Sequence, residues 1–234
     1  MENRIPSRTE QEYRLETREL MQNADNRVPI VLCIECSYGM KKYLGKVVDA
    51  VRDFCENIRK DPVACNCVEL CMISYGGNTA KLERRFTLAK NLDVPQLEGD
   101  RLTPLADAAE LAMKALEIRR ENYALGGIGN QAPLILFIGG GGRAGSLGET
   151  AKRLRDMAET GGITIKCVSV GGRNAAGCAP LKELSPDGKV LFLEELKIGK
   201  FFDFLSQAVR RSSDSILREE ANYRELDQWE DVLS

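Results

Sequence analysis

The feature that most constrains the fold is a near-continuous apolar run over residues 29–35, which leads directly into the loop 35–40. The run lacks polar alternation, a pattern typical of a parallel strand that is covered on both faces. Parallel α/β sheets bind ligands beyond the carboxyl ends of their strands, near the point where the strand order reverses. The strand end at Glu35 is therefore the first candidate for a functional site.

The rest of the chain alternates between strand-like and helix-like segments. The turn Gly76-Gly77-Asn78 predicts a hairpin whose second strand is an antiparallel edge. The other predicted segments are strands at 68–75, 80–88, 133–138, 163–170 and 190–193, and helices at 42–59, 104–121, 148–160, 181–184 and 200–211. This order predicts an α/β fold with a doubly wound, mostly parallel Rossmann-like sheet, one antiparallel edge strand and helices on both faces.

The two ends of the chain differ in composition from the middle. Residues 1–27 are predicted to form a charged N-terminal arm, residues 28–213 one domain, and residues 214–234 an acidic tail. Three apolar residues of the tail, Tyr223, Leu226 and Trp229, follow one another at approximately helical spacing. Such a stripe suits docking into a partner's groove or packing on the chain's own domain.

The composition excludes several classes of function. The chain of 234 residues has no histidine, so hydrolytic triads that depend on a histidine base are excluded. A net charge of −2 gives no reason to expect a nucleic-acid partner. Eight cysteines without paired metal-binding spacing predict reduced core thiols of a cytoplasmic protein. The charged N-terminus does not resemble a signal peptide, and no segment is apolar enough to span a membrane.

Three loops are expected to meet at the carboxyl edge of the sheet: 35–40, 99–104 and 139–146. In the second loop, Thr103 is predicted to cap a helix whose first residue is Pro104. The candidate binding rim is drawn from all three loops and consists of Glu35, Cys36, Ser37, Tyr38, Gly39, Thr103, Gly139, Gly140, Gly141 and Arg143.

These loops and their spacing resemble the von Willebrand factor A (vWA) family, whose metal-ion-dependent adhesion site carries an Asp-x-Ser-x-Ser motif after the first strand. The matching segments are RVPIVLCIECSYGM, GDRLTPLADAAELA and APLILFIGGGG, and the ending GGRNAAGCAPLKELSPDG is similar to the bacterial tellurium-resistance group of that family. The resemblance covers residues 28 to about 211 and implies a binding module, not an enzyme.

The family's metal site maps onto this chain with two losses. Glu35 stands at the first Asp of the motif, Ser37 at its first Ser and Gly39 at its second Ser. Thr103 matches the loop threonine, and Gly139 stands where the family has a second Asp. Glu35, Ser37 and Thr103 are the oxygen ligands that remain for Mg²⁺, which prefers an octahedral set of oxygens including carboxylates. We therefore expect a largely lost metal site, no cofactor, and Glu35 bonded to Ser37, Thr103 or backbone amides.

The resemblance also implies a context. Proteins of the tellurium-resistance group are thought to act in bacterial stress-response or conflict-type systems, beside a protein kinase and a metal-dependent phosphatase. The predicted function is thus a cytoplasmic protein–protein interaction scaffold, with no nucleic-acid or membrane partner. Two alternatives stay open. One is an atypical Mg²⁺-dependent protein binder. The other is a nucleotide or phosphate sensor that uses the 139–146 loop, where Gly140, Gly141 and Arg143 fit a glycine-rich pattern.

Cys36 precedes the first predicted helix of the domain. A helix dipole can lower the pKa of a thiol at its N-terminus, which leaves open a redox-sensor role for Cys36, although no nearby cysteine is a clear resolving partner. The alternative is a buried thiol with no reactivity.

Overall fold

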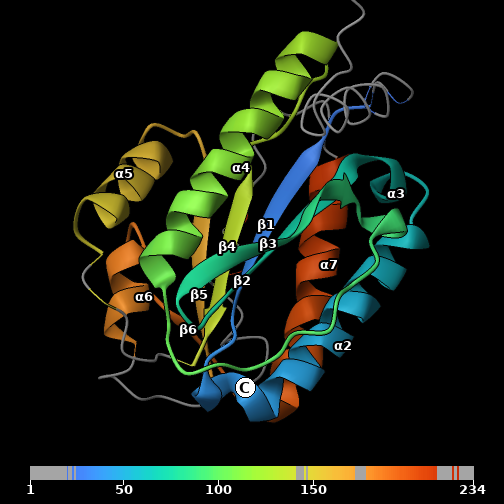
Figure 1. Ribbon diagram of the computed structural model, residues 1–234. Coiled ribbons are helices and arrows are strands. Elements are labelled where there is room, and N and C mark those ends of the chain that lie inside the picture. Colours follow the sequence, from blue (N-terminus) through green and yellow to red (C-terminus); the bar gives the residue numbers. More distant parts are fainter. Residues whose placement is uncertain are drawn as a thin grey trace, which may run out of the picture.

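The computed structural model describes residues 25–140, 147–171 and 178–214, together with Leu20, Asn23, Gly145, Tyr223 and Leu226. Six strands form one sheet in the order β3-β2-β1-β4-β5-β6 (Figure 1). Their bounds are β1 Val28–Glu35, β2 Val68–Gly76, β3 Thr79–Leu88, β4 Leu134–Gly139, β5 Thr164–Val170 and β6 Leu191–Leu193. Neighbouring strands are parallel except for the antiparallel pair β2–β3. The predicted fold class is confirmed.

Helices cover both faces of this sheet (Figure 1). On one face lie α2 (Lys41–Arg59) and α7 (Ile198–Asp214), and on the other lie α4 (Leu105–Gly126), α5 (Gly148–Glu159) and α6 (Ala179–Leu184). The short elements are α3 (Ala64–Cys67) and the 3-10 turns η1 (Tyr38–Met40), η2 (Ala89–Asn91) and η3 (Glu195–Lys197). None of the described helices combines the length and the apolar character that crossing a membrane requires.

Strand β1 is buried on both sides because it is central in the sheet. Its side chains alternate between two cores, with Ile30 and Leu32 packed under α2 and α7, and Val31 and Cys33 packed under α4. Every residue of β1 is buried. This explains why the sequence of the strand is apolar throughout instead of alternating.

The strand order reverses between β1 and β4. From β1 the chain proceeds outward through β2 and β3, and it then returns to the other side of β1 as β4. Glu35 therefore ends a strand beside Tyr75 of β2, its register partner, while Ile34 pairs with Ile138 of β4. Gly139, the last residue of β4, lies across the reversal point from Glu35.

Helix α4 differs from its prediction at both ends. It begins at Leu105 with Pro104 at the capping position, and no side chain caps it, so the prediction that Thr103 is the cap is wrong. The helix continues past the predicted end to Gly126, because Asn122 and Tyr123 are buried against the domain. Gly127 then ends the helix in the left-handed conformation, at φ 63°, which glycine adopts without strain. Gly126 and Gly127 therefore belong to the end of this helix.

Candidate functional site

The loops 35–40 and 99–104 meet at the carboxyl edge of the sheet, at the bottom of Figure 1. The backbone N–H of Asp100 donates to the carbonyl of Cys36 at 2.6 Å, and Ser37 and Asp100 form an isolated parallel bridge. The predicted meeting of these two loops is confirmed. Gly77 follows β2 nearby, where an added Cβ would lie 2.4 Å from a carboxylate oxygen of Asp100. The hairpin turn and the second loop are thus in close contact.

The carboxylate of Glu35 is held by two neighbouring loops. Its Oε1 accepts a hydrogen bond from the hydroxyl of Ser37 at 2.5 Å, and its Oε2 accepts one from the backbone N–H of Gly140 at 3.0 Å. Glu35 is only 2% exposed. Oε1 therefore holds the loop that follows β1, and Oε2 connects β1 with the end of β4, as expected for bonds to Ser37 and to a backbone amide.

Gly139 is the residue over which this carboxylate lies. A Cβ added at Gly139 would be 2.3 Å from Oε2 of Glu35 and 2.8 Å from the hydroxyl of Tyr75. Tyr75 is itself fixed because its hydroxyl donates to the carbonyl of Ile138 at 3.2 Å. The extra methylene of Glu35, relative to aspartate, thus fills the space that a side chain at position 139 would need.

The electrostatics of this region favour protonated neutral groups around Glu35. Burial, and then the charge of Glu35, raises the pKa of the Tyr75 phenol well above its ordinary value. Burial, and then the carboxylates of Glu83 and Glu35, raises the pKa of the Cys36 thiol to about 12. The thiol therefore keeps its proton at neutral pH, and this argues against the redox-sensor alternative for Cys36.

The remaining rim residues divide into buried and exposed ones. Ser37, Thr103 and Gly139 are buried, whereas Gly39 and Gly140 are exposed. Tyr38 is 74% exposed and projects from the rim. Leu102 is 55% exposed beside Thr103, and no sequence pattern distinguishes this leucine from the others in the loops. Gly141 and Arg143 lie outside the described residues, so the glycine-rich reading of the 139–146 loop is untested.

The metal-binding capacity of this edge depends on few acidic groups. Within the described ranges, no three histidine, cysteine, aspartate or glutamate side chains gather where they could hold a metal ion. Glu35, Ser37 and Thr103 supply one carboxylate and two hydroxyls, and the carboxylate already accepts bonds with both oxygens. Mg²⁺ requires about six oxygen ligands at roughly 2.1 Å, usually including more than one carboxylate or phosphate. The donors present do not fit that ion.

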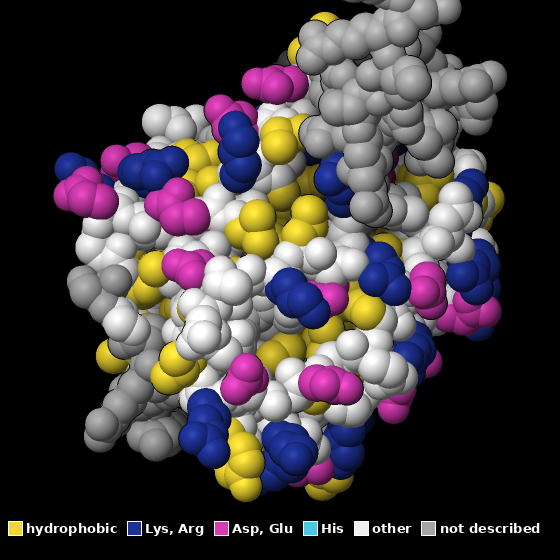
Figure 2. Space-filling model, viewed as in Figure 1, with side chains coloured by type: hydrophobic (Ala, Val, Ile, Leu, Met, Phe, Trp, Pro, Cys, Tyr) yellow, Lys and Arg dark blue, Asp and Glu magenta, His cyan; other side chains and the backbone are white. Residues whose placement is uncertain are grey.

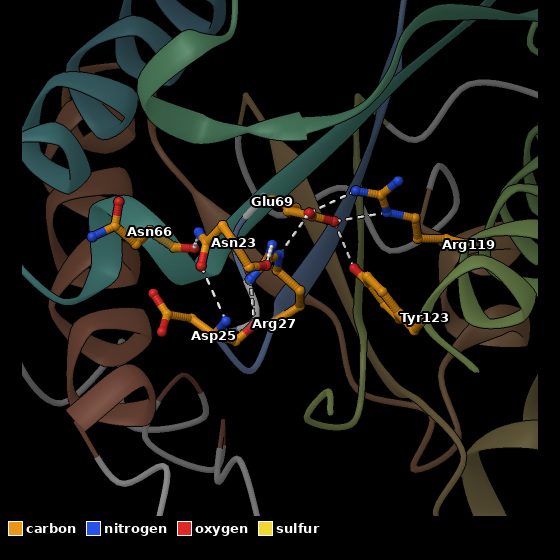
Figure 3. A network of polar contacts seen from close by, with 7 residues as sticks. All are labelled: Asn23, Asp25, Arg27, Asn66, Glu69, Arg119 and Tyr123. Carbon is orange, nitrogen blue, oxygen red and sulfur yellow. Dashed lines mark hydrogen bonds and ion pairs between the residues drawn. The ribbon is translucent and has the colours of Figure 1, made fainter. Parts of the chain in front are cut away.

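A second buried glutamate lies at the opposite, amino edge of the sheet (Figure 3). Glu69 accepts hydrogen bonds from Arg27 at 3.0 Å, from Arg119 at 2.6 and 2.8 Å, and from the Tyr123 hydroxyl at 2.6 Å. Arg27 also donates to the carbonyls of Asn23 and Asp25. The network joins β1, β2 and α4. No sequence motif indicated it, because Glu69 lies 42 residues from Arg27, 50 from Arg119 and 54 from Tyr123 along the chain.

Two other predicted groups are placed by the structure. None of the eight cysteines forms a disulfide, and all except the partly exposed Cys65 are buried. This confirms the prediction of core thiols. In the tail, Tyr223 and Leu226 are buried in the core beneath α2 and α7, which favours packing on the chain's own domain over docking into a partner. Trp229 lies outside the described residues.

Comparison with known proteins supports the fold but gives no assignment by sequence. No family model matches the chain, and no curated protein matches it significantly. Solved structures do match, among them the vWF domain of the type V pilus tip protein Mfa5 from Porphyromonas gingivalis, with a TM-score of 0.58 and 10% identity over 80% of this chain and 96% of that one. The chain thus has the fold of a von Willebrand factor A domain.

Two longer proteins contain a similar domain. The pilus adhesin SpaC from Lactobacillus rhamnosus GG matches with a TM-score of 0.59 and 12% identity over 81% of this chain. Proximal thread matrix protein 1 from the mussel byssus matches with a TM-score of 0.54 and 11% identity over 80% of it. The chain spans only 31% of the adhesin and 47% of the matrix protein.

Proposed function

We propose that this chain is a non-enzymatic protein-interaction scaffold whose binding face is the carboxyl edge of the sheet. We use the name carboxyl-edge rim for the exposed part of this edge, which is formed by Tyr38, Gly39, Arg101, Leu102 and Gly140. It combines an aromatic ring, an aliphatic side chain, a guanidinium and accessible glycine backbone. Aromatic residues and arginine are the side chains most enriched in the centres of protein interfaces.

The observation that carries this proposal is the engagement of both Glu35 oxygens by Ser37 and Gly140. An adhesion site that works through a metal needs its carboxylates turned toward the ion. Here the carboxylate instead ties two loops together, over a glycine where a second acid would collide with it. We infer that the metal site is degenerate and that the rim binds through its shape and surface side chains.

The surface around the rim supports contact with another macromolecule. Figure 2 shows Lys and Arg side chains beside apolar ones along the lower edge of the molecule, below the sheet. The exposed basic residues of this edge include Lys41, Lys42 and Arg101. Two of the similar structures are an adhesin and a pilus tip protein by name, which also supports a binding function.

The biological setting follows only from the sequence resemblance. On that basis we infer a cytoplasmic component of a bacterial stress-response or conflict-type system related to tellurium resistance. The partners inferred with it are a protein kinase and a metal-dependent phosphatase. The absence of histidine and the protonated state of Cys36 support a binding function over catalysis.

The rim is tested by capture of partners from the native host with the full chain as bait. Leu102→Asp is expected to abolish capture of a specific partner, because it replaces the exposed aliphatic side chain of the rim with a charge. Leu125→Asp is the matched control, since Leu125 is 69% exposed at the far end of α4. Equal loss with both variants, or no effect of Leu102→Asp, contradicts the proposal.

The metal inference has a separate test. Titration calorimetry with Mg²⁺ and Mn²⁺ is expected to give no heat beyond dilution at millimolar metal, for the native chain and for Glu35→Ala alike. A saturable signal that Glu35→Ala removes would instead establish the Mg²⁺-dependent binder. A thermal shift with nucleotides that is lost in Arg143→Ala would establish the sensor that uses the 139–146 loop.

A further inference from the structure

A polar hollow of about 760 Å³ lies at the amino edge of the sheet, at the end of the molecule opposite the carboxyl-edge rim. It is lined by the start of β1, the start of β2, the end of β3 with η2, and helix α4. The polar lining residues are Asn23, Asp25, Arg27, Asn66, Glu69, Thr87, Lys90, Asn91 and Arg119. The interior of the hollow thus has side-chain amides and charged groups on several sides.

The charges that line the hollow are unequal. Among the described residues, three cations, Arg27, Lys90 and Arg119, line the hollow together with two carboxylates, Asp25 and Glu69. Both arginines are almost completely buried, and in Figure 3 they approach Glu69 from opposite sides and share its one carboxylate. The pair of arginines with Glu69 therefore carries a net charge of +1 inside the protein.

Lys90 adds a further positive charge to the wall. Its ammonium donates to the side-chain oxygen of Asn66 at 2.6 Å, and that acceptor is neutral. The Lys90 backbone is held in place as well, because its carbonyl accepts two bonds from Arg59 at 2.7 and 3.0 Å. The Lys90 ammonium is thus placed at the wall of the hollow by these contacts.

An uncompensated charge that is removed from water is costly, and a bound counter-charge offsets that cost. Guanidinium and ammonium groups bind oxyanions through charge-assisted hydrogen bonds. In the structure, Arg119 bonds Glu69 through Nε and Nη2 while its plane lies over the ring of Tyr123, with 5.1 Å from Cζ to the ring centroid. The network therefore holds the guanidinium rigidly, which lowers the entropic cost of binding an anion.

We propose that this hollow is a binding site for a small oxyanion of the phosphate or carboxylate class. The anion would lie between Lys90 and the Arg27–Glu69–Arg119 network, with the amides of Asn66 and Asn91 as further donors. This site is independent of the carboxyl-edge rim, from which it is separated by the length of the sheet. Binding at the amino edge would stabilise the start of β1, because Arg27 links that strand to the network.

The proposal is tested on the full chain by thermal denaturation with sodium phosphate and, separately, with sodium citrate, each against sodium chloride at equal ionic strength. A specific site raises Tm in a saturable manner, because a ligand that binds only the folded state stabilises it by mass action. The two probes distinguish a phosphate site from a carboxylate site. A Tm that rises no further than in sodium chloride overturns the proposal.

Variants connect the effect to the hollow. Lys90→Ala is expected to raise the dissociation constant about tenfold for whichever of the two anions raises Tm. The reason is the loss of one charge-assisted hydrogen bond to that anion. Lys152→Ala, an exposed lysine on α5, is the matched control and leaves affinity unchanged. If Lys90→Ala and Lys152→Ala bind the anion with the same affinity, the proposal is contradicted. The network is then only a structural link between the strands and helix α4.

Glu69→Gln provides an independent test with the opposite sign. It removes the shared carboxylate, so the charge of the hollow rises from +1 to +2 while the hydrogen-bonding shape is largely kept. Affinity for the anion is expected to increase about tenfold, even as the variant without ligand becomes less stable. Weaker anion binding by a folded Glu69→Gln contradicts the proposal. If this variant does not fold, Lys90→Ala still decides the question.

Discussion

The two edges of the sheet each contain a buried glutamate, and the two glutamates are held in different ways. At the carboxyl edge, Glu35 accepts hydrogen bonds from a hydroxyl and a backbone amide, and its side chain fits over a glycine. At the amino edge, Glu69 accepts hydrogen bonds from two guanidinium groups and a phenol. The first site is defined by shape, and the second is defined by charge.

This difference predicts which substitutions each edge tolerates. Around Glu35, the donors are neutral, so a change of volume is expected to matter more than a change of charge. Around Glu69, the partners are cations that lost their water on folding, so removing one of them takes charge-assisted hydrogen bonds from a carboxylate that water cannot reach. The following substitution experiments compare the two edges, from the largest expected effect to the smallest.

The largest effect is expected from Arg119→Met, which removes one of the two cations of Glu69. The loss of a partner from a buried ion pair costs about 3–5 kcal/mol in the free energy of unfolding. Urea denaturation followed by circular dichroism measures it. Arg153→Met is the matched control, because Arg153 pairs with Glu110 in solvent, at 2.9 Å, and such pairs contribute about 0–1 kcal/mol. Similar costs for both arginines would contradict the charge-defined site.

An intermediate effect is expected from Gly139→Ala at the carboxyl edge. The new Cβ would meet Oε2 of Glu35 at 2.3 Å, so the carboxylate must move and lose its bond to Gly140. Overpacking of this kind costs about 1–3 kcal/mol. Gly45→Ala in α2 is the control, since its Cβ has open space around it and alanine stabilises a helix by about 1 kcal/mol over glycine.

A double variant makes the shape argument specific. Glu35→Asp shortens the side chain by one methylene and withdraws the carboxylate from position 139. The combined Glu35→Asp and Gly139→Ala variant is therefore expected to be more stable than the sum of the single effects predicts. A coupling free energy of about 0.5–3 kcal/mol is typical of residues in contact. Additive effects in the denaturation series would show that the two residues do not compete for space.

The smallest effect concerns thiols at the two edges. The partly exposed Cys65 of α3, at the amino edge, is expected to account for the fast phase of native-state labelling with a thiol reagent at pH 8. Cys36 is expected to stay unlabelled, because a pKa of about 12 leaves roughly one thiol in ten thousand ionised at that pH. Cys65→Ser should remove the fast phase, and a fast phase lost in Cys36→Ser would contradict this assignment.

The raised pKa of Cys36 also makes the free energy of unfolding depend on pH. The Cys36 thiol has a folded-state pKa of about 12 against 9.0 for an ordinary thiol, so folding favours the protonated form. Its contribution to stability is complete below about pH 9 and is lost as the pH rises toward 12. Cys36→Ala is therefore expected to reduce the decline of stability between pH 9 and 11, measured by urea denaturation at each pH.

Much of the fold could be predicted because local patterns and burial agree. The apolar run of β1, the glycine turn before β3 and the helical period of α2 each specify one element and its neighbours. The predicted ends of α4 were wrong for a tertiary reason. Thr103 is a good capping residue by type, but the helix starts after Pro104, and the buried residues Asn122 and Tyr123 extend it to Gly126.

The candidate site was predicted less completely than the fold. The sequence placed Glu35, Ser37 and Gly139 at one edge because each follows or ends a strand of a parallel sheet. It did not show that the Tyr75 hydroxyl lies against Gly139, or that Leu102 is exposed. Both facts depend on how neighbouring strands and loops pack. The sequence also could not decide between a buried and a reactive thiol at Cys36, since its pKa depends on burial and on Glu83 of β3.

By itself, the sequence determined the parallel sheet, the loops that meet at its carboxyl edge, and the absence of histidine chemistry, because these depend on residue type and on spacing along the chain. Only the tertiary structure decided where the Glu35 carboxylate points and that Arg27, Glu69 and Arg119 form one charged network. The physical reason is that hydrogen-bond geometry and desolvation arise between residues 42 to 105 positions apart, and local patterns carry no record of them.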